Sequence, residues 1–315
     1  MADGIWRSRG QPLSRAHRVN MKTSTAQKYV LVTAAYNEEA LIEATIQSVA
    51  AQTVPPARWV IVSDGSTDRT DEIVQRYAVE NPWIHLHRIT EDHPRNFAAQ
   101  VYAINAGMAQ LQGLDYDFIG NLDADVTMGP EYFERLLLRF KQDPQLGLAG
   151  GAIHEKAADG QFRARLTNSP TSVAHACQLF RRGCFSAVGG AYVPLPYGGP
   201  DAYAETTARM KGWRVQTFDD LVMFHHRPAG SAGGLLRSWY RQGKMDYSLG
   251  ALPLFELFKL AKRVAEKPYG IGALARLAGF INSYLRGEDR AVSEEFVAYL
   301  RKEHKRRLIN LFRPT

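Results

Sequence analysis

The chain has 315 residues, of which 45% are hydrophobic and 23% charged, and its formal net charge is +7. This composition is ordinary for a globular protein and excludes a chain that is disordered as a whole. Residues 1–28 contain six Lys or Arg against one Asp, and residues 259–315 contain thirteen against six Asp or Glu, so the chain between them is net negative. A nucleic-acid-binding protein would carry its basic surface within the fold. We therefore expect no nucleic-acid partner; basic ends suit an anionic membrane surface or serve solubility.

Two cysteines, Cys177 and Cys184, argue against a disulfide framework and for a reducing compartment. Residues 1–28 lack the apolar core of a secretory signal, and the longest uncharged stretch, 183–200, is broken by glycine and proline. The expectation is a cytoplasmic protein, at the inner face of the cell membrane if its basic ends bind lipid.

From residue 29 onward, short β-rich runs alternate with segments of helical periodicity. The run 29–34 is apolar on both faces, as in a fully buried strand, and the next helix is expected to have Asn37 as its N-cap. Further strands are expected at 59–63, 84–88, 117–122, 146–153, 178–181, 214–218 and 221–224. Helices are expected near 71–78, 97–108, 133–140 and 202–210. This alternation predicts an α/β fold with a mainly parallel central sheet flanked by helices.

Beyond residue 234 the sequence becomes helical. Around residues 254–263, Lys and Arg accompany an apolar stripe. A basic amphipathic segment of this kind suits peripheral contact with a membrane. Packing against the rest of the protein is the alternative.

Three predicted strands end in polar, turn-forming sequence: 35–38 (AYNE), 63–68 (SDGSTD) and 123–125 (DAD). Ligands bind at the carboxyl ends of the strands of a parallel sheet, so these loops should share one edge. Asp123 and Asp125 can point to the same side of a strand end, where their like charges favour a bound cation. Carboxylates suit Mg²⁺ or Mn²⁺, which also bind diphosphate oxygens. A lone D-x-D is frequently a solvated turn; its position after an apolar strand favours a metal site.

The turn at 63–68 has two interpretations. Asp64 and the glycine after it suffice for a simple Asx turn. Alternatively, the Asp64 carboxylate accepts an N–H of a nucleotide base, and Tyr36 stacks on that base or fills the space beneath the loop.

The segments 32–38, 63–68 and 123–125 together resemble the nucleotide-binding half of the family 2 glycosyltransferases, which have the GT-A fold. The resemblance extends to about residue 245. It implies that Ala35, Tyr36 and Glu38 line a nucleotide pocket and that Asp64 contacts the nucleobase. It also implies that Asp123 and Asp125 hold the diphosphate through Mn²⁺ or Mg²⁺. The family commonly has aspartate where this chain has Ser63.

The segment 199–205 resembles the acceptor side of the same family. Counted back from Gly212, Asp201 falls at the aspartate of the family's Glu-Asp pair, and Pro200 replaces the glutamate. The resemblance implies that Asp201 is the general base for the acceptor hydroxyl, and a single base opposite the leaving group implies inversion. Glu205, one turn later, is the competing candidate, and either residue could simply be a carboxylate favoured at a helix start.

His225 and His226 follow the last predicted strand, and neutral imidazole is a ligand for Mn²⁺-like ions. Adjacent strand residues face opposite sides, so one histidine should reach the metal. His226 is taken as that ligand, with His225 as the alternative.

These expectations describe an inverting glycosyltransferase that transfers one sugar from a UDP-, GDP- or dTDP-linked donor to a saccharide or lipid-linked acceptor, in polysaccharide or lipid-linked oligosaccharide biosynthesis. An inactive sugar-nucleotide-binding relative and a nucleotidyltransferase are the alternatives. A nucleotidyltransferase would favour a glycine-rich phosphate loop, whereas residues 32–39 contain no glycine. A processive synthase of this family would carry a Gln-x-x-Arg-Trp motif, which is absent from the sequence.

The expected organisation has three parts. Residues 1–28 form a basic disordered arm, residues 29–245 the GT-A catalytic domain, and residues 246–315 a helical C-terminal extension. Within the catalytic domain, 29–125 is the nucleotide-binding half and 126–245 the acceptor half.

Overall fold

The computed structural model describes residues 27–90, 97–157, 159–166, 168–227, 234–264 and 269–311. The arm expected at residues 1–28 therefore lies almost wholly outside the described residues. The strands are β1 (Tyr29–Ala35), β2 (Arg58–Asp64), β3 (Ile84–Ile89), β4 (Phe118–Leu122), β5 (Val126–Met128), β6 (Leu146–Lys156), β7 (Phe162–Ala164), β8 (Cys177–Arg181) and β9 (Arg214–His225). The helices are α1 (Ile42–Ala50), α2 (Thr70–Glu80), α3 (Phe97–Ala109), α4 (Tyr132–Gln142), α5 (Arg182–Ala187), α6 (Pro200–Met210), α7 (Leu235–Ser248), α8 (Pro253–Arg263), α9 (Ile271–Leu285) and α10 (Glu294–Leu311).

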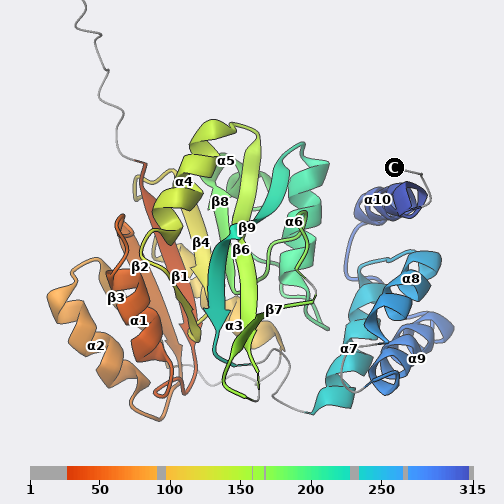
Figure 1. Ribbon diagram of the computed structural model, residues 1–315, viewed down its shortest axis with the longest axis horizontal. Coiled ribbons are helices and arrows are strands. Elements are labelled where there is room, and N and C mark those ends of the chain that lie inside the picture. The colour runs from red at the N-terminus through yellow and green to blue at the C-terminus, as the bar shows by residue number, and fades with distance from the viewer. Residues whose placement is uncertain are drawn as a thin grey trace, which may run out of the picture.

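The strands form one sheet in the order β3-β2-β1-β4-β8-β6-β9-β5, and β7 pairs with β6 off this path. The first four strands in this order are parallel, and so are β6 and β9. Strand β8 runs antiparallel between β4 and β6 and joins the two parallel groups. The α/β class with helices on both faces of the sheet is therefore confirmed (Figure 1).

Two apolar cores lie on opposite faces of the sheet, and β1 shows how the sequence builds both. Tyr29 and Leu31 belong to one core, together with apolar residues of α1, α2 and α4. Val30 and Val32 belong to the other, together with residues of α3, α5 and α6. Successive strand residues point to opposite faces, so a strand covered on both sides must be apolar throughout.

Asn37 does not cap α1, which begins at Ile42. Asn37 has a left-handed backbone, with φ of 54°, and its Oδ1 accepts a hydrogen bond from the backbone N–H of Thr67 at 2.8 Å. Asparagine tolerates this conformation because its short side chain bonds locally. The residue that was expected to start a helix therefore joins the loop after β1 to the loop after β2.

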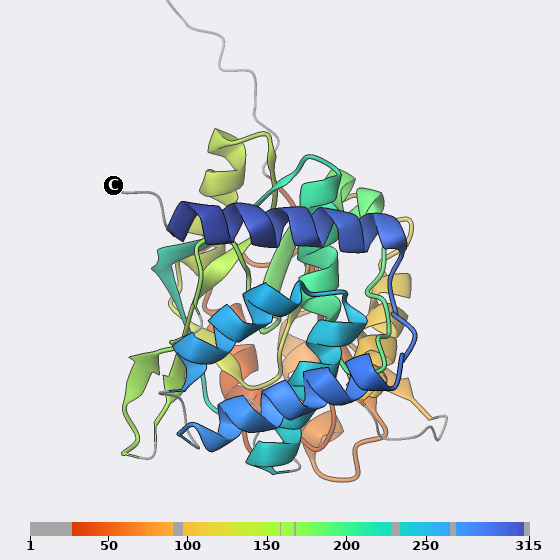
Figure 2. The same cartoon turned by 90° about the vertical axis from the view of Figure 1, so that its right-hand side faces the viewer.

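The last four helices form a layer beside the sheet, on the side of α6 (Figures 1 and 2). Helices α7 and α9 approach closely at two glycines: a Cβ placed on Gly243 would lie 1.9 Å from the carbonyl oxygen of Arg276, and one on Gly279 would lie 2.0 Å from that of Tyr240. The boundary expected at residue 246 falls inside α7. Among the described residues, no helix combines the length and apolar character needed to cross a membrane.

Candidate active site

The loops after β1 and β2 are hydrogen-bonded to each other at the carboxyl edge of the sheet. The backbone N–H of Asn37 donates to Oγ of Ser66 at 3.1 Å, and that of Glu38 donates to Oγ1 of Thr70 at 2.8 Å. Asp64, the last residue of β2, is buried. Tyr36 lies at this edge with 45% of its surface exposed.

Ala35 closes β1 below these loops. It pairs with Ser63 of β2, and its side chain is buried in one of the apolar cores. On the other side of β1, Val32 pairs with Asn121 of β4. Asp64 and Asp123 therefore flank the end of β1, separated by two strand spacings, or roughly 10 Å.

Asp123 and Asp125 lie in the turn between β4 and β5, and the structure brings His225 to them. One ligand atom from each of the three residues lies within 4.8 Å of the others. The register of β5 and β9 explains the arrangement, because Val126 pairs directly with His225. Carboxylate oxygens suit Mn²⁺ and Mg²⁺, and the imidazole, a borderline donor, favours Mn²⁺ of the two.

The spacing within this cluster also suits a cation. Nε2 of His225 lies 3.2 Å from Oδ1 of Asp125. Ligands about 2.0–2.2 Å from a common ion lie about 3–4.4 Å apart, according to whether they are adjacent or opposite. The other ring nitrogen, Nδ1, is buried and has no hydrogen-bond partner among the described residues. The donor types of the cluster and the spacing of Asp125 and His225 are therefore compatible with a divalent metal.

His226 lies elsewhere. Its Nε2 is 2.8 Å from Oγ1 of Thr127, and its ring meets the ring of Phe162 edge-on at 5.2 Å. Burial and the nearby charge of Lys156 lower the pKa of His226. The cluster of possible metal ligands thus contains His225, the alternative weighed from the sequence, because His225 is the last residue of β9 and the next residue in an extended chain faces the opposite side.

His175 is a site residue that sequence reasoning missed. Its Nδ1 lies 3.6 Å from Oδ1 of Asp123, and Nε2 of Gln100 donates to the same oxygen at 3.2 Å. Burial favours the neutral acid at Asp123, but hydrogen bonding and the charges of His175 and His225 prevail and lower its pKa. No sequence signal pointed to His175, because its position depends on the antiparallel pairing of β8 with β4, which sets Leu122 opposite Cys177.

Arg227 connects the loop after β1 to the cluster of possible metal ligands. Its guanidinium forms an ion pair with Glu38, and its Nε lies 3.4 Å from Oδ2 of Asp125. Burial raises the pKa of Glu38; Arg227 opposes that rise, and the charges of Asp125 and Asp123 add to it. Glu38, predicted for the nucleotide pocket, therefore lies in the same electrostatic cluster as the two metal-ligand candidates.

Asp201 lies in the first turn of α6, after Gly198 and Gly199, which both have φ of 88°. This left-handed pair requires glycine and turns the chain into the helix. Asp201 is half-buried. Burial lowers the pKa of His175, but the contact with Asp123 and the charge of Asp201 outweigh it and raise the pKa. Asp123 and Asp201 thus both raise the pKa of the His175 imidazole.

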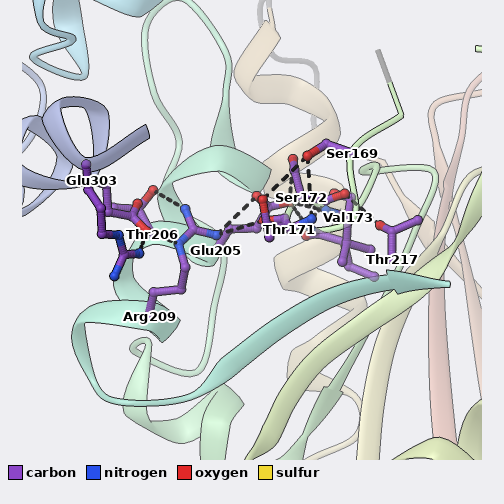
Figure 3. Close-up of polar contacts among 11 residues, drawn as sticks. Ser169, Thr171, Ser172, Val173, Glu205, Thr206, Arg209, Thr217 and Glu303 are labelled. Carbon is purple, nitrogen blue, oxygen red and sulfur yellow. Dashed lines mark hydrogen bonds and ion pairs between the residues drawn. The ribbon is translucent and has the colours of Figure 1, made fainter. Parts of the chain in front are cut away.

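Glu205 has a different environment (Figure 3). It is buried, and its Oε1 accepts hydrogen bonds from the backbone N–H of Val173 at 2.6 Å and from Oγ of Ser172 at 3.3 Å. Its Oε2 lies 3.7 Å from Arg209. Burial and the charge of Asp201 raise the pKa of Glu205 to about 8. This carboxylate ties α6 to the segment before β8, whereas Asp201 remains partly accessible.

Comparisons with known proteins agree with this geometry. A model of glycosyl transferase family 2 matches residues 30–188. The poly-β-1,6-N-acetyl-D-glucosamine synthase of Staphylococcus aureus is 31% identical over 118 residues, which are 38% of this chain and 26% of that protein. The succinoglycan biosynthesis protein ExoA of Rhizobium meliloti is 35% identical over 229 residues, covering 64% of each chain. The chain thus spans about a quarter of the length of the first relative and under two thirds of the second.

Among solved structures, the mannosyltransferase PcManGT of Pyrobaculum calidifontis, in complex with GDP-Man and Mn²⁺, is similar with a TM-score of 0.55 and 18% identity. The alignment covers 92% of this chain and 82% of that one. This likeness confirms the GT-A fold, and the matched segment spans half of the chain. The chain belongs to glycosyl transferase family 2.

Proposed function

We propose that this protein is an inverting, metal-dependent glycosyltransferase that moves a sugar from a nucleoside-diphosphate donor to a hydroxyl acceptor. The observation that carries the proposal is the cluster of Asp123, Asp125 and His225 within 4.8 Å, at the edge where the loops after β1 and β2 converge. Both relatives described above are named for polysaccharide synthesis, so a saccharide or lipid-linked acceptor in such a pathway is part of the proposal.

The donor would lie along the carboxyl edge of the sheet. Tyr36 offers an exposed ring on which a base can stack, and Asp64 lies at the end of the neighbouring strand to accept a base N–H. The diphosphate would then extend toward Asp123 and Asp125. A divalent cation bound there would neutralise the negative charge that develops on the leaving nucleoside diphosphate.

Asp201 would act as the general base. Its carboxylate removes the proton of the acceptor hydroxyl as that oxygen attacks the anomeric carbon, and the bond to the diphosphate breaks on the opposite face. Glu205 is unsuited to this role because it is buried and already accepts backbone and hydroxyl hydrogen bonds.

The testing experiment combines donor binding with turnover. The melting temperature is measured with UDP, GDP, dTDP and their sugars, with and without Mn²⁺. A ligand at about 100 times its dissociation constant adds about 2.7 kcal/mol to stability. We expect the nucleotides of one nucleobase to raise the melting temperature, and we expect this rise to depend on Mn²⁺. A melting temperature unchanged by every nucleotide, in both metal conditions, would refute the proposal.

Two matched variants separate an enzyme from a binding protein. Asp201→Asn should keep the nucleotide-induced shift while nucleotide release from the identified donor falls by about 10²–10⁴-fold. Asp219→Asn, at an exposed carboxylate of β9, should leave both readouts unchanged. Equal turnover by Asp201→Asn and wild type would exclude Asp201 as the base.

A further inference from the structure

The outer surface of α8 and α9 is unusually apolar. Among the described side chains of these two helices, every exposed one is apolar or tyrosine. Leu254 and Leu257 of α8 are 63% and 54% exposed. On α9, exposed apolar residues recur at helical spacing, at Ile271, Leu274, Ile281 and Leu285. Scattered exposed apolar residues are normal, but two adjacent helices with apolar outer faces form a patch that requires an explanation.

Three charged residues of the same helices, Glu256, Lys259 and Arg276, point inward, the reverse of the usual pattern for a surface helix. Arg276 of α9 and Glu256 of α8 are 2% and 1% exposed and lie 2.8 Å apart, Nε to Oε1. Lys259 of α8 contacts Asp246 of α7 at 2.6 Å. The charges neutralise one another beneath the layer, and the apolar side chains are left outside.

Basic residues at the end of α9 and on α10, here called the cationic rim, border this apolar face on one side. Within residues 234–311, the described exposed charged side chains are six basic and three acidic. The basic ones include Arg286, directly after α9, and Lys302, Lys305 and Arg306 on α10. Figure 2 shows α8, α9 and α10 side by side as the layer nearest the viewer, so the basic half of α10 borders the apolar face.

We propose that this outer face of α8 and α9 docks on the surface of a bilayer that contains anionic lipids. The apolar side chains would enter the interface between head groups and acyl chains, and the basic residues around them would contact the acidic head groups. Helices α8 and α9, which have 11 and 15 residues, can lie in the plane of that interface. A second copy of the chain fits less well, because a two-fold contact would bring the two cationic rims together.

Vesicle sedimentation of the full chain tests this proposal, without nucleotide or metal, so that its outcome is independent of the proposed activity. The vesicles are phosphatidylcholine alone, or an equal mixture with phosphatidylglycerol. Wild type should sediment with the anionic vesicles. Leu274→Glu/Ile281→Glu should reduce the bound-to-free ratio by about tenfold or more, because two anchoring side chains become charged. Lys302→Glu/Lys305→Glu should weaken binding to anionic vesicles specifically.

The matched control places the same substitutions at exposed apolar positions of other helices. Val79 of α2 is 84% exposed and Leu138 of α4 is 49% exposed, so Val79→Glu/Leu138→Glu adds the same charge away from the proposed face. Binding by this variant should equal that of wild type. Leu274→Ser/Ile281→Ser repeats the test without added charge, and circular dichroism checks that each variant is folded.

Several results would overturn the inference. One is wild type that remains in the supernatant with anionic vesicles, and another is sedimentation of both α9 variants to the same extent as wild type. A wild type that is dimeric in light scattering without lipid and becomes monomeric in Leu274→Glu/Ile281→Glu would assign the face to a second copy instead.

Discussion

Nε of Arg209 on α6 lies 2.9 Å from Oε1 of Glu303 on α10, and both side chains are largely buried. The same guanidinium lies 3.7 Å from Glu205, so one arginine is placed between two interior carboxylates (Figure 3). The stacked rings of Tyr203 and Phe296, 5.0 Å apart, join the same two helices. The C-terminal helix is therefore fastened to the helix that carries Asp201.

Replacing Arg209 with methionine should destabilise the protein strongly. The substitution keeps an apolar stem but removes the nearer guanidinium from the buried carboxylate of Glu303, whose other basic neighbour, Arg306, lies 3.9 Å away. Removing one partner of a buried ion pair typically costs about 3–5 kcal/mol. The free energy of unfolding in urea at neutral pH measures this loss. Arg163→Met is the matched control: Arg163 pairs with Asp159 at the surface, where both side chains are at least half exposed. Its loss should stay within about 1 kcal/mol, and equal losses in the two variants would contradict the prediction.

Glu205 should make stability depend on pH. Its pKa is about 8 in the folded protein against an ordinary 4.5, so the folded state binds more protons between these values. The stability that Glu205 contributes is then fully present below pH 4.5 and is lost as pH rises through about 8. The variant Glu205→Gln lacks this titration. The free energy of unfolding of wild type, minus that of the variant, should therefore fall by about 3 kcal/mol from about pH 5.5 to 8.5.

Urea unfolding of wild type and Glu205→Gln at both pH values gives this difference, because other titrating groups cancel between the two proteins. A difference that stays constant with pH would mean that Glu205 is ionised throughout this range. A difference that increases with pH would mean that Arg209 lowers its pKa more strongly than burial raises it.

Gly279→Ala should disrupt the packing of α7 against α9. The added Cβ would lie 2.0 Å from the carbonyl oxygen of Tyr240, so the helices would have to separate. Overpacking of this kind commonly costs about 1–3 kcal/mol, and backbone contact places this site at the upper end. Gly183→Ala, in α5, is the control: its Cβ has no neighbour nearer than 3.7 Å, and alanine is the better helix former. Thermal unfolding should show a loss for the first variant and none for the second.

The two adjacent histidines provide a direct test of the metal cluster. His225→Ala should abolish the Mn²⁺-dependent part of the nucleotide-induced thermal shift, because it removes one of three clustered donors. His226→Ala removes a side chain that is hydrogen-bonded to Thr127 and should preserve the Mn²⁺-dependent part of the thermal shift. The reverse result would mean that the end of β9 rotates when metal binds.

Much of the fold was predictable because local sequence and burial agree. The strands β1 and β2 are apolar on both faces, and α4 has an apolar stripe that includes Phe133, Leu136 and Phe140. Short elements such as β5, β7 and α5 were not predicted, since three to six residues carry no periodicity. The start of α1 was misplaced because asparagine suits both an N-cap and the left-handed turn that Asn37 adopts.

Two carboxylates of the candidate site could be found because of their place at apolar strands: Asp64 is the last residue of β2 and Asp123 directly follows β4. His175 could not be found in this way, because its place beside Asp123 depends on which distant strand β8 pairs with. The choice between His225 and His226 depends likewise on one register, Val126 opposite His225. Strand order and register are tertiary properties, and they could not be read from this single sequence.

The central position of β8 has a consequence for any shortened form of this protein. A fragment ending before residue 160 would retain Asp64, Asp123 and Asp125 but would lack both histidines that approach the aspartates, because β8 and β9 bring them from later in the chain. Such a fragment would hold the proposed nucleotide-binding residues but an incomplete set of the candidate metal ligands. Complementation of two separately purified pieces should restore Mn²⁺ affinity only when β8 has inserted beside β4.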